Sequence, residues 1–243
     1  HSGATSQDVI DTALSLTLQD FSTLLQIRLE TLSQTLVELS RRFEAAPLMG
    51  RTRMQAALPI TAADRLATWV TPLEAHLHRL TDLRPRVEQL QLGGAAGNRA
   101  AMAPVAEVIA AEMARSLGLS NPPRAWHAMR DGVCEYAGIL ALITGTLGKM
   151  GQDICLMAQQ GVDEIALARG GGSSAMPHKQ NPIQAELLVT LARFNATQVA
   201  GMHQAIVHEQ ERSGAAWTLE WMILPPMAQA TARSLSVASE ICA

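Results

Sequence analysis

The sequence predicts an all-α fold, a bundle of roughly five long helices, and two observations lead to this prediction. Ala, Leu and Met are plentiful within a hydrophobic content of 48%, whereas aromatic residues make up only 3%. Unbranched side chains lose little rotamer freedom in a helix, so this composition favours helices over sheets. Apolar residues also recur at spacings of three and four, which is the pattern of one buried helix face.

The first predicted helix covers residues from about 7 to 45. Its apolar positions form one stripe, made of Leu14, Leu18, Phe21, Leu25, Leu29, Leu32, Leu36, Leu39 and Phe43. A helix of this length is too long for a small globule to cover. We therefore expect an extended bundle that assembles into a multi-subunit helical core.

Pro47 and Gly50 end this helix, and the segment 50–61 is expected to be a loop or a broken helix. A glycine-rich break at 92–98 separates later elements. No internal repeat or flexible linker is visible, so residues 1–243 are expected to form one helical domain. The further helices are expected at 62–90, 104–117, 131–160, 183–210 and 218–240.

Charge and cysteine usage exclude several function classes. The formal net charge is -3 without a long basic run, which argues against nucleic-acid binding. The three cysteines lack metal-binding spacing, so reduced thiols, a cytoplasmic location and no metal or cofactor are expected. No uninterrupted apolar stretch could span a membrane, and no signal peptide is visible. The chain opens without Met, so we expect a segment to be missing upstream.

The segment 170–186, "GGGSSAMPHKQNPIQAE", has the composition of a chemical loop. Asn181 and Pro182 are suited to the N-cap and first position of a helix, and Lys179 lies just before them. This end should attract an anion such as a carboxylate. Ser173 can act as a base if a cation and N–H donors stabilise its alkoxide. The alternative is a glycine-rich helix cap with exposed serines.

The stretch "GSSAMPHKQNP" closely resembles the signature loop GSSxMPxKxNP of the fumarase/aspartase superfamily. This resemblance implies a central helical-bundle domain preceded by a small domain. It also implies a homotetramer with active sites shared between subunits, and proton transfer beside a carboxylate. Under it Ser173 is the catalytic base, Lys179 and Asn181 bind the substrate carboxylate, and Glu186 orients a catalytic histidine of the family.

The opening residues "HSGATSQD" place Thr5 or Ser6 at a helix N-cap with Asp8 in the first turn. On its own this is a plain capping motif. It also resembles the first superfamily motif, HxGxTSxD, which implies that Thr5 and Ser6 contact substrate.

The stretch "GRTRMQAALP" resembles the second superfamily motif, GRTHxQxAxP, in which Thr52 and Gln55 match substrate-binding positions. Arg53 replaces the motif histidine and cannot serve as a general acid near neutral pH. This departure leaves Glu186 without its usual partner. We interpret Arg53 as a fixed positive charge for an additional substrate carboxylate.

Three segments, "GATSQDVIDT", "WHAMRD" and "EQERSGAAWTLEW", resemble the carboxymuconate cycloisomerase branch of the superfamily. The implied activity interconverts 3-carboxy-cis,cis-muconate and 4-carboxymuconolactone in protocatechuate catabolism, with a small polycarboxylate as substrate. Arg130 and Arg212 are candidate carboxylate ligands. For His127, substrate contact and a packing role both stay open. The rival readings are another lyase of the superfamily, such as adenylosuccinate lyase, and a non-catalytic scaffold.

Overall fold

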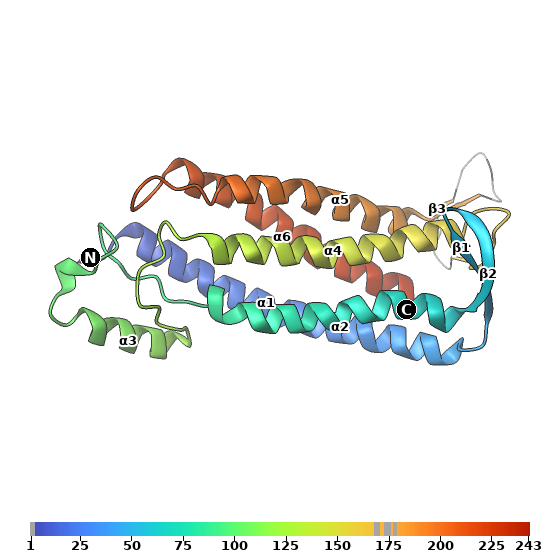
Figure 1. The fold of residues 1–243 in the computed structure, drawn as a ribbon, viewed down its shortest axis with the longest axis horizontal. Helices are drawn as coiled ribbons and strands as arrows, with labels where there is room; N and C mark the ends of the chain where they lie inside the picture. Colours follow the sequence, from blue (N-terminus) through green and yellow to red (C-terminus); the bar gives the residue numbers. More distant parts are fainter. Residues whose placement is uncertain (1–2, 168–170, 173–175, 177–178) are drawn as a thin grey trace. The chain divides into compact units, whose positions relative to one another are not determined.

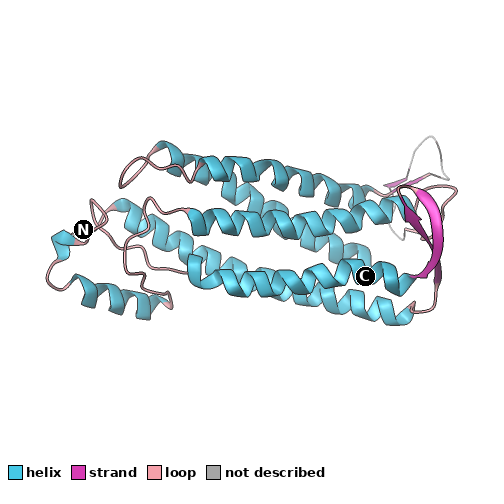
Figure 2. Cartoon of the chain, in the orientation of Figure 1, coloured by secondary structure: helices cyan, strands magenta, loops and turns pink. Residues whose placement is uncertain are grey.

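The computed structural model describes residues 3–167, 171–172, 176 and 179–243, and this part of the chain is mostly helical, as predicted (Figures 1 and 2). A 3₁₀ turn, η1 (Ala100–Met102), precedes the short helix α3 (Ala106–Leu117). The long helices of the described residues are α1 (Ser6–Arg42), α2 (Ala62–Val87), α4 (Asp131–Met157), α5 (Ile183–Gln204) and α6 (Ala215–Cys242).

The chain divides into two compact units, and each long helix contributes residues to both. Unit 1 comprises His1–Gln26, His78–Ile139 and Gln198–Pro226. Unit 2 comprises Ile27–Leu77, Leu140–Thr197 and Met227–Ala243.

The predicted apolar stripe of α1 is buried over most of its length. Leu25, Leu29, Leu32 and Leu36 are fully buried, whereas Phe43, just past the helix end, is exposed. None of the helices formed by residues 3–167, 171–172, 176 and 179–243 is both long and apolar enough to cross a membrane.

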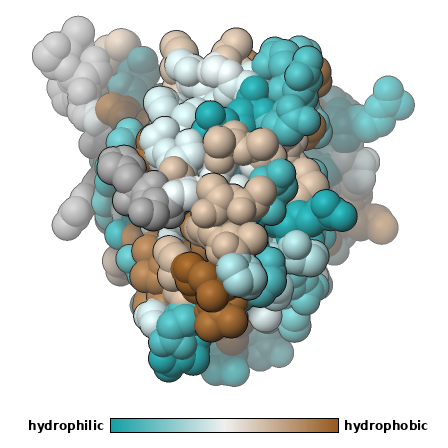
Figure 3. Space-filling model, turned by 90° about the vertical axis from the view of Figure 1, so that its left-hand side faces the viewer, coloured by the Kyte–Doolittle hydropathy of each residue, from teal (hydrophilic) through white to brown (hydrophobic). Residues whose placement is uncertain are grey.

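Unit 1 contains a small core between α3 and the connection that precedes it. The core consists of Leu90, Leu92, Met102, Ala106, Ala110 and Ala114. Gly118 caps the C-terminal end of α3, and its φ of 67° lets its N–H donate to the carbonyls of Ala114 and Arg115. The outer face of α3 is partly apolar, because Val108 and neighbouring side chains are exposed. Apolar side chains gather in the lower part of the face drawn in Figure 3.

Unit 2 contains an antiparallel hairpin where the sequence predicted a loop or broken helix, so that prediction was wrong. Strand β1 (Pro47–Thr52) pairs with β2 (Gln55–Thr61), and the hairpin is drawn in magenta in Figure 2. Its two-residue turn is Arg53–Met54, with φ values of 51° and 67°. Such turns favour Asn-Gly or Asp-Gly, which is why neither residue signalled a hairpin.

A second, shorter ladder lies beside the predicted chemical loop. Strand β3 (Gly171–Gly172) pairs with β4 (Gln180–Asn181). Asn181 is therefore a ladder residue, and the expectation that it caps the following helix is corrected. The carbonyl of Pro182 instead accepts the N–H of Glu186 at 2.9 Å, which starts α5. A Cβ atom at Gly171 would lie 2.1 Å from Cδ1 of the exposed Ile183, so a larger residue there would require that side chain to move.

Candidate functional site

Thr5 immediately precedes α1, and hydrogen bonds of its backbone fix it in place. Its N–H donates to Asp8 Oδ2 at 2.9 Å, and the N–H of Asp8 donates to the Thr5 carbonyl at 3.1 Å. A carboxylate three residues into the helix that accepts the cap N–H is half of a capping box. The predicted contacts Thr5 and Ser6 therefore start α1. Thr5 is half-buried and Ser6 is exposed.

Asp8 is buried, with 3% of its surface exposed. It joins the start of α1 to Gly93, Gly94 and His127, and we call this group of residues, with Thr5, the corner. Asp8 accepts the N–H groups of Gly93 at 2.8 Å and Gly94 at 2.9 Å. His127 Nε2 donates to the same carboxylate at 2.7 Å. Burial acts to raise the pKa of Asp8, but the hydrogen bond from His127 and the three backbone donors hold it below its ordinary value. Asp8 is therefore a buried carboxylate whose donors come from three separate segments.

Arg212 lies beside Thr5 at this corner. The exposed Arg212, between α5 and α6, donates from Nη1 to Thr5 Oγ1 at 2.5 Å. The cap uses the backbone of Thr5, so the hydroxyl is available for this contact. A hydroxyl and a guanidinium thus stand together where the sequence predicts a substrate carboxylate.

Arg130 has a different environment from the one the sequence predicted. Its guanidinium is buried, and it bonds to Glu220 at 2.9 and 2.5 Å and to Asp11 at 2.9 and 3.2 Å. It also lies 4.7 Å from the centre of the Trp126 ring. Arg130 therefore forms buried ion pairs with two carboxylates inside unit 1. The prediction that it contacts substrate is corrected, because its donors are directed to these carboxylates.

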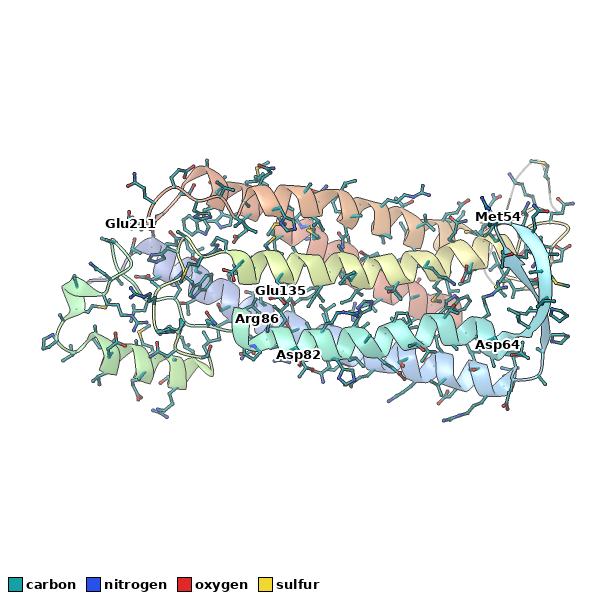
Figure 4. All side chains as sticks on the ribbon, in the orientation of Figure 1. Met54, Asp64, Asp82, Arg86, Glu135 and Glu211 are labelled. Atoms are coloured by element: carbon teal, nitrogen blue, oxygen red, sulfur yellow. The ribbon has the colours of Figure 1, made fainter. Side chains whose placement is uncertain are left out.

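The hairpin tip of unit 2 brings the residues of the second motif together. Thr52 and Gln55 are the last cross-strand pair, and Arg53 and Met54 form the turn between them. All four residues are exposed. Figure 4 labels Met54 at this tip.

A cavity of about 940 Å³ borders the tip, and its lining includes several charged side chains. Arg51 pairs with Glu164, and Lys149 pairs with Asp153. Arg53 also lines this cavity, and its guanidinium has no hydrogen-bond partner among the residues that the structure describes. Within the described residues Arg53 is therefore a cation without a partner, which suits a carboxylate ligand.

Ser173, the predicted base, lies outside the described residues. The β3–β4 ladder joins the two sides of the segment that contains it. Lys179 and Glu186 are both exposed, the latter in the first turn of α5. Asn181 lies between them in β4 and is half-buried.

Sequence reasoning did not predict that the Asp8 carboxylate accepts the N–H groups of Gly93 and Gly94. The stretch "LGGAAGN" was visible as a break, but no local pattern tells which carboxylate its N–H groups bind. As for metal ligands, the described part of the chain contains no cluster of three or more His, Cys, Asp or Glu side chains.

Comparison with known proteins gives a consistent result. A family model described as Lyase matches residues 1–201. The chain is 40% identical to the 3-carboxy-cis,cis-muconate cycloisomerase of Pseudomonas aeruginosa over 98% of its own length and 52% of that protein. It is 33% identical to the N-acetyl-S-(2-succino)cysteine lyase of Enterococcus italicus over 99% of its length and 54% of that protein.

The fold is similar to a solved structure as well. The crystal structure of 3-carboxy-cis,cis-muconate lactonizing enzyme from Pseudomonas putida has a TM-score of 0.93 and 38% identity, covering 100% of this chain and 54% of that one. The chain spans about half the length of the curated relatives it matches. The match to the family model over residues 1–201 means that the chain belongs to the lyase family, the fumarase/aspartase superfamily that its motifs predict.

Proposed function

We propose that the complete protein is a cycloisomerase that interconverts 3-carboxy-cis,cis-muconate and 4-carboxymuconolactone in the cytoplasm, within protocatechuate catabolism. The observation that supports this most is the 40% identity, over 98% of this chain, to a relative named for that reaction. The replacement of the motif histidine by Arg53 supports the same choice, because a tricarboxylate substrate needs an additional cation.

In the proposed reaction one substrate carboxylate adds to a carbon–carbon double bond of the same molecule, and a proton adds to the carbon beside another carboxylate. In reverse, the Ser173 alkoxide removes that proton. The C–H electron pair forms the double bond, and the electron pair of the lactone C–O bond leaves on the carboxylate oxygen. Negative charge develops on the carboxylate beside the reacting carbon. Each well-placed donor facing it contributes on the order of 3 kcal/mol.

We assign substrate binding to three regions of the chain. Lys179 and Asn181 bind the carboxylate beside the reacting carbon, and Glu186, in the first turn of α5, is assigned with Ser173 to the catalytic group. Thr52, Gln55 and Arg53 at the hairpin tip bind a second carboxylate. Thr5 and Ser6 bind a third. These assignments are supported by the match to the superfamily motifs and by the position of Thr52, Arg53 and Gln55 together at the hairpin tip. The contact of Thr5 with Arg212 supports the third.

We further propose that the protein is a homotetramer whose active sites combine these regions from different subunits. The support for this is the superfamily resemblance together with several apolar side chains exposed on the long helices. Examples are Leu142 and Met222, with exposed fractions of 52% and 70%. Where such side chains form a contiguous patch, they mark a surface that a partner covers.

The test is turnover of 3-carboxy-cis,cis-muconate by the complete protein, followed by its ultraviolet absorbance, with the lactone identified by NMR. Ser173→Ala should lower kcat by at least about 100-fold if the serine is the base. Adenylosuccinate and N-acetyl-S-(2-succino)cysteine are assayed in parallel, the latter because a relative named for it is 33% identical. Turnover of either one without lactone formation would contradict the proposal and assign the corresponding lyase activity to the protein. No turnover of any substrate would favour the scaffold.

A further inference from the structure

We propose that His127 and Asp8 form a buried positioning pair that holds the Thr5 hydroxyl in place for a substrate carboxylate. The inference deepens the proposed function and rests on it, because it assigns a purpose to a contact inside unit 1. It makes His127 a positioning residue in place of the substrate contact that the sequence left open.

The pair joins three segments that are distant in sequence. Asp8 Oδ1 accepts the bond from His127 Nε2 at 2.7 Å and the bond from the Gly93 N–H at 2.8 Å. Asp8 Oδ2 accepts the N–H groups of Thr5 and Gly94, both at 2.9 Å. The side chains of His127 and Asp8 are 2% and 3% exposed, so water cannot easily replace a lost donor. Loss of the imidazole would leave a buried carboxylate short of one donor and free to shift.

The glycine loop closes tightly on the imidazole. A Cβ atom at Gly93 would lie 2.9 Å from His127 Cε1 and 2.4 Å from the Cβ of Ala125. Because an ionised carboxylate only accepts hydrogen bonds, Nε2 of His127 must carry a hydrogen. Its Nδ1 is buried and has no hydrogen-bond partner among the described residues. The ring therefore acts through Asp8, since its other nitrogen is enclosed by protein.

The link to the substrate side runs through Thr5. Both backbone polar groups of Thr5 bond to Asp8, so a shift of Asp8 moves Thr5 with it. The Thr5 hydroxyl is the group that meets Arg212 at 2.5 Å. Small displacements of binding groups weaken the interaction with substrate even when the chemistry itself is intact. The expected consequence of disturbing the pair is thus a raised KM with a preserved kcat.

The first test compares His127→Met, which keeps the bulk and removes the donor, with His127→Gln, whose amide can donate in place of Nε2. In the complete protein, His127→Met should raise the KM for 3-carboxy-cis,cis-muconate roughly tenfold with kcat within about twofold. His127→Gln should restore most of the KM. In a Thr5→Val background, His127→Met should add no further rise, because both changes remove the same interaction. An additional rise of the same factor would overturn the proposal.

A matched control is Tyr136→Phe, which also removes a buried side-chain hydrogen bond in unit 1. Tyr136 Oη lies 3.0 Å from Ser22 Oγ, and no contact of this pair with Thr5 is present in the described residues. This variant should lose stability and keep the KM. If Tyr136→Phe raised the KM as much as His127→Met does, the effect would be general loosening and the positioning assignment would be wrong.

The second test does not depend on the reaction. Amide hydrogen exchange of the substrate-free protein should be faster at Thr5, Gly93 and Gly94 in His127→Met and close to wild type in His127→Gln. Unchanged exchange in His127→Met would overturn the pair. If the wild-type protein converted no carboxymuconate, the proposed function would fail on its own, while the exchange result would still decide whether the pair positions Thr5.

Discussion

Two of the three regions that we assign to substrate binding are built in opposite ways. The corner around Thr5 in unit 1 rests on the buried Asp8, whose carboxylate accepts hydrogen bonds from groups inside the protein. The hairpin tip around Arg53 in unit 2 is exposed, and its guanidinium has no hydrogen-bond partner in the described part of the chain. The corner is thus preformed by buried hydrogen bonds, whereas the tip presents an exposed cation on a short turn.

The two regions also differ in the source of their unfavourable free energy. In the corner, the buried carboxylate of Asp8 loses its hydrogen bonds to water. The N–H groups of Gly93 and Gly94 replace them. At the tip, Arg53 and Met54 occupy left-handed conformations without the help of glycine, at a cost on the order of 1 kcal/mol each. Substitutions in the corner should therefore change stability, and substitutions at the tip should mainly change substrate affinity.

The largest expected effect is on the stability of unit 1. Arg130→Met would leave Asp11 and Glu220 buried without their cation, and it should lower the free energy of unfolding by about 3–5 kcal/mol. Urea denaturation measures this loss. The control is Arg86→Met, because the Arg86–Glu135 pair labelled in Figure 4 is about half exposed and should contribute at most about 1 kcal/mol. Equal losses in the two variants would erase the distinction between interior and surface pairs.

The next effect concerns affinity at the tip. Arg53→Gln should raise the KM for carboxymuconate by about 10–100-fold, since a charge-assisted contact to a carboxylate is lost. Its melting temperature should not fall. Arg115→Gln serves as control, because Arg115 is an exposed arginine on α3 with a 73% exposed side chain, paired with Glu112. A KM unchanged in Arg53→Gln would mean that the tip arginine does not meet the substrate.

A smaller effect tests the backbone of the same turn. Met54→Gly removes the left-handed strain and should raise the free energy of unfolding by about 1 kcal/mol or less, with turnover kept. The comparison with Arg53→Gln separates the conformation of the tip from its charge. A stability loss would show that the exposed Met54 side chain makes stabilising contacts in the assembled protein.

The smallest effect distinguishes two buried carboxylates by pH. Burial raises the pKa of Glu220 above its ordinary value, although Arg130 opposes this, and the pKa of Asp8 is lowered by its hydrogen bonds in spite of burial. The wild type should therefore gain stability relative to Glu220→Gln as pH falls toward 4.5, the unperturbed value for Glu. Relative to Asp8→Asn it should lose stability as pH falls below 3.8, the unperturbed value for Asp. Slopes of the same sign would contradict the two environments.

Sequence patterns were sufficient for the helices and insufficient for the contacts between distant segments. The spacing of Leu25, Leu29 and Leu36 identified the buried face of α1 because helix periodicity is local. The hairpin was missed because its turn residues, Arg53 and Met54, lack the usual left-handed preference. Arg130 looked like a free cation because its carboxylate partners lie 119 and 90 residues away in sequence.

The two regions meet in our proposal, where the corner of one subunit and the tip of another complete each shared active site. The most direct measurement mixes two variants of the complete protein, Thr5→Val/Arg212→Met and Arg53→Gln, by joint unfolding and refolding. The proposal predicts that the mixture turns over carboxymuconate faster than the average of the two variants refolded alone, because some sites regain both intact regions. Mixed oligomers that form without any gain in turnover would contradict it.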